Sequence, residues 1–147
     1  MTETQSAAAA VAPADLERIR DLLTAFAWFA DRGDGDGLSR LFLPEGVLHV
    51  GGQDLVGREQ IGRDCIRRAA LPGRKARHVW SNLRIEGVEV DRISTTAVQL
   101  TFEQVDEQGS ASTHLRVNDL FDNFTGDGKG GWHFARRRIE RAMALVL

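Results

Sequence analysis

Apolar side chains recur at spacings of three and four residues through the first half of the chain, which is the period of helices that bury one face. The clearest stripe begins at Asp15, a candidate N-cap, and ends near Gly33, where the run DRGDGDG combines turn chemistry with low helix propensity. The pattern predicts three helices: residues 15–33, a short helix capped by Asp34 or Asp36 that carries Leu38, Leu41 and Phe42 and ends at Pro44, and a third from about Arg58 to Ala70.

The second half of the chain changes to β-rich segments separated by turn signals. After a short β run at residues 47–50, Gly51 and Gly52 turn the chain toward the third helix, and the later segments comprise residues 76–90, 93–105, 111–124 and 132–141. Helices followed by a meander of strands favour the α+β class, with an antiparallel sheet and about three N-terminal helices on one face. We expect one domain over residues 14–147, preceded by a flexible N-terminal arm of residues 1–13.

The length and the net charge of the chain indicate which kinds of molecule it binds. A chain of 147 residues with 42% hydrophobic and 27% charged residues is typical of a globular domain with one core. Nucleic acids and acidic membrane surfaces require a strongly basic face, so the net charge of -2 argues against both and favours a small-molecule substrate. The single Cys65 cannot form an intramolecular disulfide, and no apolar run reaches the roughly 20 residues that span a bilayer, so we expect a cytoplasmic protein.

Two polar residues are candidates for acid/base chemistry. Asp31 lies on the last turn of the first helix, where the negative end of the helix dipole disfavours a carboxylate unless donors compensate. His78 lies in the β run RHVWSNLRI, and a histidine in an apolar cavity is a natural general base when a carboxylate orients its ring. The alternative interpretations are a turn residue for Asp31 and a structural residue for His78.

The strand at residues 111–124 alternates polar and apolar side chains. His114, Arg116 and Asn118 share one of its faces, which is either an unusually polar cavity wall or the solvated outer face of the sheet. Trp80, two residues from His78, lies on the same side of its strand as that histidine and is either an apolar wall for a flat substrate or part of the core.

The sequence contains no pattern that points to a metal or cofactor. DRGDGDG lacks the ligand order and the distant Glu of a calcium loop, and the four histidines show neither HxxxH nor HxH spacing. GDGKGG lacks the ending of a phosphate-binding Walker motif and is expected to be a hairpin loop. We therefore expect neither a metal site nor a cofactor.

Several weak motifs in a familiar order nevertheless suggest a family. AWFADRGDGDGLSRLF, then RHVWSNLRIEG, HLRVNDLFDNF and GGWHFARR resemble the SnoaL-like branch of the nuclear-transport-factor-2-like superfamily over residues 14–141. Within it the pattern is most similar to the group of scytalone dehydratase and hexachlorocyclohexane dehydrochlorinase. The resemblance implies a cone-shaped, strongly bent sheet whose concave side is closed by the helices, a homodimer or homotrimer, and a catalytic Asp–His pair at Asp31 and His78.

The resemblance also has departures, which limit the chemistry it implies. Scytalone dehydratase holds a water with two tyrosines and ketosteroid isomerases use a tyrosine donor, but this chain has no tyrosine. By resemblance, the lysine of the dehydrochlorinase falls on Phe26 and its arginine on Arg137, while the base of the isomerases falls near Val50 or His49. The pocket Asn and second pocket His of scytalone dehydratase fall on Arg116 and near Glu103.

These observations predict a cofactor-independent lyase of the dehydratase type, or an isomerase or cyclase, acting on a small apolar substrate that is cyclic or polyketide-like. His78, oriented by Asp31, is the expected base, with Arg116, Arg137 or Asn118 stabilising the charge that develops. The remaining expected substrate-binding residues are Phe26, Val50, Trp80, Glu103 and His114. The alternative is a non-catalytic subunit or ligand-binding module of the same fold, such as a protein like the β subunit of ring-hydroxylating dioxygenases.

Overall fold

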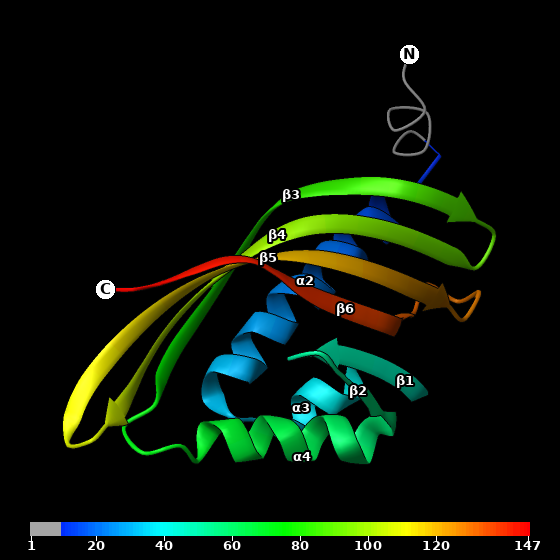
Figure 1. Cartoon of the computed structure of the whole chain (residues 1–147). Coiled ribbons are helices and arrows are strands. Elements are labelled where there is room, and N and C mark those ends of the chain that lie inside the picture. Colours follow the sequence, from blue (N-terminus) through cyan, green and yellow to red (C-terminus); the bar gives the residue numbers. More distant parts are fainter. Residues whose placement is uncertain (1–9) are drawn as a thin grey trace.

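The computed structural model describes residues 10–147 and shows three helices held in the hollow of a strongly bent, open six-stranded sheet (Figure 1). The expected α+β class and cone-like shape are confirmed. The elements in chain order are α2 (Pro13–Arg32), α3 (Gly35–Arg40), β1 (Phe42–Val50), β2 (Gln53–Val56), α4 (Gly57–Ala69), β3 (Lys75–Glu89), β4 (Arg92–Glu107), β5 (Ser110–Gly126) and β6 (Trp132–Val146).

Helix α2 lies along the concave side of the sheet and begins earlier than expected. Pro13 lies in its first turn, where the missing N–H costs nothing, and Gly33 ends it in the left-handed conformation. Asp15 is therefore inside the first turn and accepts a hydrogen bond from the Trp132 indole at 2.9 Å. Residues 1–9 of the expected arm lie outside the described residues, whereas Val11 packs into the core with 8% of its surface exposed.

The second helix is shorter than the sequence pattern predicts. Asp34 caps α3, because its side chain accepts a hydrogen bond from the backbone N–H of Gly37 at 2.8 Å. The helix ends at Arg40, and Phe42 and Pro44 belong to β1 instead. The expected extension to Pro44 is wrong because Phe42, fully buried, pairs with Phe134 of β6 and stacks on its ring.

The sheet is mixed, not purely antiparallel. Its strand order is β2-β1-β6-β5-β4-β3, and β1 runs parallel to β6 while all other neighbours are antiparallel. Parallel neighbours need a long connection, and here it comprises β2, α4 and the whole β3–β5 meander. The short strand β2, absent from the sequence-based prediction, pairs with β1 directly after the turn at Gly51 and Gly52.

Irregular pairing accompanies the bend of the long strands over the helices. The β3–β4 register shifts between Ser81 and Arg84, where Asn82 has a φ of 58°, and the β5–β6 register shifts after Val117. Such bulges bend and twist a strand locally. The bend gives the sheet a concave face that is open toward α4 at one end and covered by α2 at the other (Figure 1).

Candidate functional site

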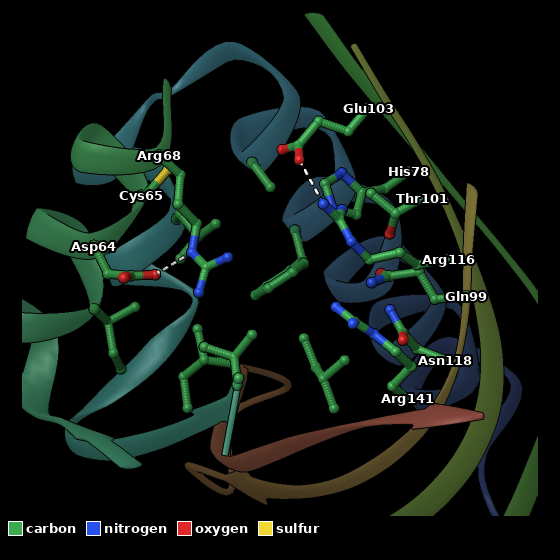
Figure 2. A pocket seen from close by; sticks show the side chains of 18 of the residues that line it. Asp64, Cys65, Arg68, His78, Gln99, Thr101, Glu103, Arg116, Asn118 and Arg141 are labelled. Atoms are coloured by element: carbon green, nitrogen blue, oxygen red, sulfur yellow. Dashed lines mark hydrogen bonds and ion pairs between the residues drawn. The ribbon is translucent and has the colours of Figure 1, made fainter. Parts of the chain in front are cut away.

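A cavity of about 530 Å³ lies between the concave face of the sheet and the three helices. This size is typical of a small-molecule site. Its wall combines apolar side chains with the charged and polar side chains labelled in Figure 2, which lie on two facing walls. Helices and strands both contribute the apolar part: Phe26, Ala30, Leu38, Leu48, Val50, Ile61 and Ile139.

The strand register decides which side chains face this cavity. His78 pairs with Thr101 and Thr101 pairs with Arg116, so these three residues form one row across β3, β4 and β5. Directly paired residues project from the same face of a sheet, and all three line the cavity. The polar face of residues 111–124 is therefore the concave one over Arg116 and Asn118, which resolves the two interpretations left open by the sequence.

The ring of His78 is held by Asp31 from the last turn of α2. Its Nδ1 lies 2.6 Å from Asp31 Oδ1, and its backbone N–H donates to the same carboxylate at 3.0 Å. The two side chains are only 12% and 5% exposed. Because an ionised carboxylate only accepts, Nδ1 carries a proton, so in the neutral form of the ring Nε2 has the lone pair. The two donors also compensate the unfavourable helix dipole at Asp31.

Beside this pair, Glu103 is clamped between two arginines. Arg74 Nε donates to its Oε2 at 2.9 Å, and Arg116 Nη2 donates to its Oε1 at 2.6 Å. Burial raises the pKa of Glu103, but the hydrogen bonds and charges of Arg116 and Arg74 lower it by a larger amount. The pKa therefore lies below its ordinary value of 4.5. Glu103 is therefore an ionised anchor that holds Arg116 in the cavity wall (Figure 2).

Helix α4 supplies the facing wall with Asp64, Cys65 and Arg68. Asp64 is an acceptor for both Arg67 and Arg68, each at 2.7 Å, and the Arg68 side chain extends from α4 into the cavity (Figure 2). Burial raises the pKa of the Cys65 thiol above its ordinary value, against the lowering effect of Arg74. The thiol is thus a small apolar part of the wall and not a thiolate nucleophile.

Six of the ten residues predicted for the site line the cavity: Phe26, Val50, His78, Glu103, Arg116 and Asn118. Asp31 lies directly behind His78 and contacts the cavity only through it. The three others, Trp80, His114 and Arg137, do not line the cavity.

Trp80 and His114 lie on the concave face outside the cavity. The Trp80 indole packs against the core and donates to Thr24 of α2 at 3.1 Å, so α2 covers it. His114 Nε2 lies 3.1 Å from Glu107 near the β4–β5 hairpin, beyond Glu103. Both side chains are on the same face of the sheet as His78 and Arg116. Neither lines the cavity, because Trp80 is covered by α2 and His114 contacts the β4–β5 hairpin.

Arg137 is fully buried beneath the cavity wall. It forms a two-point ion pair with Asp122, at 3.0 and 3.2 Å, and its guanidinium lies 4.3 Å from the ring centre of Phe26. Burial raises the pKa of Asp122 by more than the charge and hydrogen bonds of Arg137 lower it, so the pKa lies above its ordinary value. Because Phe26 lies between Arg137 and the cavity, a direct contact between this arginine and a substrate does not fit the structure.

Sequence reasoning missed several cavity residues, chiefly Arg74, Gln99, Thr101 and Arg141. Gln99 and Thr101 alternate with Val98, Leu100 and Phe102, which is also the ordinary pattern of a strand with one solvated face. Arg74 follows Pro72 and Gly73 in a loop, where an arginine is usually solvated. Among residues 10–147, no three His, Cys, Asp or Glu side chains come close enough together to hold a metal ion.

Residues 12–138 match the family described as the SnoaL-like domain. Among solved structures, the chain is similar to a type 2 hexachlorocyclohexane dehydrochlorinase (LinA), with a TM-score of 0.81, 17% identity, and 91% of this chain and 89% of that one covered. No curated protein matches the sequence.

Two structures from Novosphingobium aromaticivorans are also similar. A proposed scytalone dehydratase has a TM-score of 0.77 and 17% identity, with 89% of this chain and 86% of that one covered. A proposed aromatic ring hydroxylase has a TM-score of 0.82 and 20% identity, with 93% and 96% covered. At these identities the structural likeness establishes the shared fold.

Proposed function

We propose that this chain, which belongs to the SnoaL-like domain family, is a cofactor-independent lyase of the dehydratase type or an isomerase or cyclase. The single observation that carries the proposal is the contact of Asp31 with His78, whose ring lies in the wall of the cavity. The similarity to a dehydrochlorinase and to a proposed scytalone dehydratase supports it, because their names describe eliminations. The apolar side chains of the cavity wall fit a small, largely apolar, cyclic or polyketide-like substrate.

The proposed step uses His78 as a base toward carbon. Nε2 takes a proton from a C–H bond next to an electron-withdrawing group, and the C–H electron pair becomes a new π bond. In an elimination, a hydroxide or other leaving group departs from the neighbouring carbon with its bonding pair, and the imidazolium then returns the proton to it. Asp31 stabilises the imidazolium and holds the ring, since its carboxylate already accepts the Nδ1 proton.

Arg116 and Asn118 would stabilise the negative charge that develops on the substrate. Arg116 lies in the same cross-strand row as His78, and Asn118 lies in the next row along β5. Both line the cavity, and Glu103 keeps the Arg116 guanidinium from turning away. Donors that are positioned before the reaction stabilise an oxyanion or leaving group without reorganisation. Arg137 is left out of this proposal because it is paired with Asp122 behind Phe26.

Hydrogen–deuterium exchange at carbon tests the step without knowledge of the natural substrate. In D2O, the wild-type protein is expected to accelerate exchange at the acidic carbon of ring ketones such as 1-tetralone and 4-chromanone, measured by mass spectrometry. The His78→Gln variant should lose about 100-fold or more of this acceleration, because general base catalysis typically contributes that much. Melting temperatures of both proteins show whether the variant is folded.

His114→Gln is the matched control, since it removes a histidine from the same concave face outside the cavity. Its exchange rate should equal that of the wild type. The proposal is wrong if the wild type does not accelerate exchange on any ketone of the panel, or if the folded His78→Gln protein exchanges as fast as the wild type.

A second candidate function is a non-catalytic subunit, and the similarity to a proposed aromatic ring hydroxylase favours it. In that case the chain would form a stable complex with a larger iron-containing protein. Gel filtration of a native extract of the source cells, with iron measured in the fractions that contain the chain, separates the two candidates. Co-elution with a larger iron protein would support the subunit role.

A further inference from the structure

Arg141 is the one cavity arginine without an acidic partner among residues 10–147. It lies on β6 and pairs with Asn118 of β5. The register of the two strands shifts between this pair and the next one, Val117 with Met143. Its side chain lines the cavity although the residue is exposed, so it lies at the mouth. Figure 2 shows Arg141 and Asn118 together on the sheet wall, both directed into the cavity.

The other arginines of the cavity have acidic partners. Arg74 and Arg116 share Glu103, and Arg68 shares Asp64 with Arg67. Each of these two acidic residues therefore already meets two arginines.

One more acidic residue lines the cavity. Glu140 accepts from Arg138 at 3.0 Å. Among residues 10–147 the cavity lining thus contains four arginines and three carboxylates, and Arg141 is the arginine that pairs with none of the three.

We propose that the cavity binds substrates that carry a carboxylate or another planar anionic group, held at the mouth by Arg141. A guanidinium presents two parallel N–H donors that match the two oxygens of a carboxylate. Arg68 on the facing helix adds positive charge from the opposite wall. This inference rests on the proposed function and names the substrate class of the same cavity.

The register also places the anionic group relative to the reacting carbon. His78 is on β3 and Arg141 is on β6, so their Cα atoms are three strand spacings of about 4.8 Å apart across the sheet. The bound anion therefore lies along the sheet wall from the base, and not next to it. The substrate class is a one- or two-ring acid whose acidic C–H is separated from its carboxylate by the ring, with the apolar wall covering the ring faces.

Matched pairs of probes test this inference by binding alone. Benzoate is compared with benzamide, and 2-naphthoate with 2-naphthamide, by isothermal calorimetry against the wild type, Arg141→Met and Arg136→Met. Arg136 is the control because it is on the same strand, pairs with Asp54 and does not line the cavity. The melting temperature of each variant is measured beside the titrations.

The wild type should bind at least one carboxylate about ten- to 100-fold more tightly than its amide, as expected for a charge-assisted hydrogen-bonded contact. Arg141→Met should lose most of this preference and Arg136→Met should keep it. Equal affinity of the wild type for both members of each pair, including no measurable binding of either, overturns the inference. A preference that survives unchanged in Arg141→Met also overturns it.

The same titration on His78→Gln separates this inference from the proposed function. The carboxylate preference should persist in that variant because His78 does not contact the anionic group. A carboxylate preference together with no His78-dependent exchange would overturn the proposed function alone. His78-dependent exchange without a carboxylate preference would overturn the anion site alone.

Discussion

The carboxylate of Asp31 serves both the chain and the ring of His78. It accepts the backbone N–H of His78 and the ring Nδ1, so one side chain fixes where β3 crosses the end of α2 and which tautomer the imidazole adopts. The structural and functional interpretations of Asp31 are therefore both compatible with the same contacts. Substitutions that remove only one of the two roles can distinguish them.

Asp31→Asn should keep the fold and lose the chemistry. The amide oxygen still accepts a hydrogen bond, but the negative charge that stabilises the imidazolium is gone, so we expect the exchange rate to fall about 100-fold. Asp31→Ala should in addition lower the free energy of unfolding by about 1–3 kcal/mol, because the half-buried N–H of His78 loses its acceptor. Exchange kinetics and urea unfolding measure the two effects, and an Asp31→Asn protein with wild-type kinetics would contradict the role given to the charge.

Glu103 should make the protein less stable in acid. Its pKa is lower in the folded protein than the ordinary 4.5, so the unfolded chain binds the proton first. The stabilisation is therefore complete above about pH 4.5 and is lost as the pH falls through the lower, folded-state pKa. In Glu103→Gln, the free energy of unfolding should fall less steeply between about pH 6 and pH 3 than in the wild type.

Urea unfolding across this pH range measures the difference in slope. Glu17→Gln is the control, because Glu17 is exposed on α2 and should leave the wild-type slope unchanged. If Glu103→Gln and the wild type lose stability in parallel, the two arginines do not hold the carboxylate as the distances indicate.

At the scale of elements, the contact between α3 and α4 positions the helical wall of the cavity. A Cβ on Gly35 would lie 2.4 Å from the carbonyl oxygen of Gly62, and a Cβ on Gly62 would lie 2.9 Å from that of Gly35. Only glycines allow the backbones to approach this closely. The approach brings Asp64, Cys65 and Arg68 of α4 to face the sheet.

Gly62→Ala should therefore destabilise the protein although alanine is the better helix former. The propensity gain of about 1 kcal/mol is opposed by overpacking against α3, which typically costs 1–3 kcal/mol, so we expect no gain and a net loss of up to about 2 kcal/mol in urea unfolding. Arg63→Ala, on the exposed face of the same helix, should change stability by less than about 0.5 kcal/mol. A Gly62→Ala protein that is more stable than the wild type would show that the helices can separate at no cost.

At the scale of the whole molecule, the convex face of the sheet carries exposed apolar side chains. They lie in two cross-strand rows on the opposite face from His78 and Arg116, and the exposed apolar members are Val79, Phe102, Met143 and Leu145. Exposed apolar patches commonly mark contact surfaces. None of the helices among residues 10–147 is long and apolar enough to cross a membrane.

The expected homodimer or homotrimer remains a prediction, and this face is where we expect copies of the chain to meet. Sedimentation equilibrium should give a mass two or three times the 16.2 kDa of one chain. Met143→Glu should shift the distribution toward the monomer, because a carboxylate in an apolar contact is costly to bury. A wild-type protein that remains monomeric at high concentration would contradict the prediction.

Much of the architecture was predictable because it follows from local rules. The bounds of α2 and α4 and of the four long strands agree with the sequence pattern within a few residues in most cases, since helical and strand periodicity and glycine turns act over short distances. The early part of the sheet was not predictable. β2, and the change of Phe42 from helix to strand, depend on pairing with partners that are distant in the chain.

By itself, the sequence determined the α+β class, the order of helices and long strands, and the residue types available for acid/base chemistry, because these depend on composition and local period. The family resemblance of the sequence already implied the pairing of Asp31 with His78, which the structure shows as a contact of 2.6 Å. Tertiary structure alone decided that Arg116 and Asn118 face the cavity and that Trp80, His114 and Arg137 do not line it. A strand in which polar and apolar side chains alternate has two faces. Only the packing of the helices against one face decides which face lines the cavity. The sheet's bend, together with the ion pairs around Glu103 and Asp122, then decided which arginines a ligand can reach.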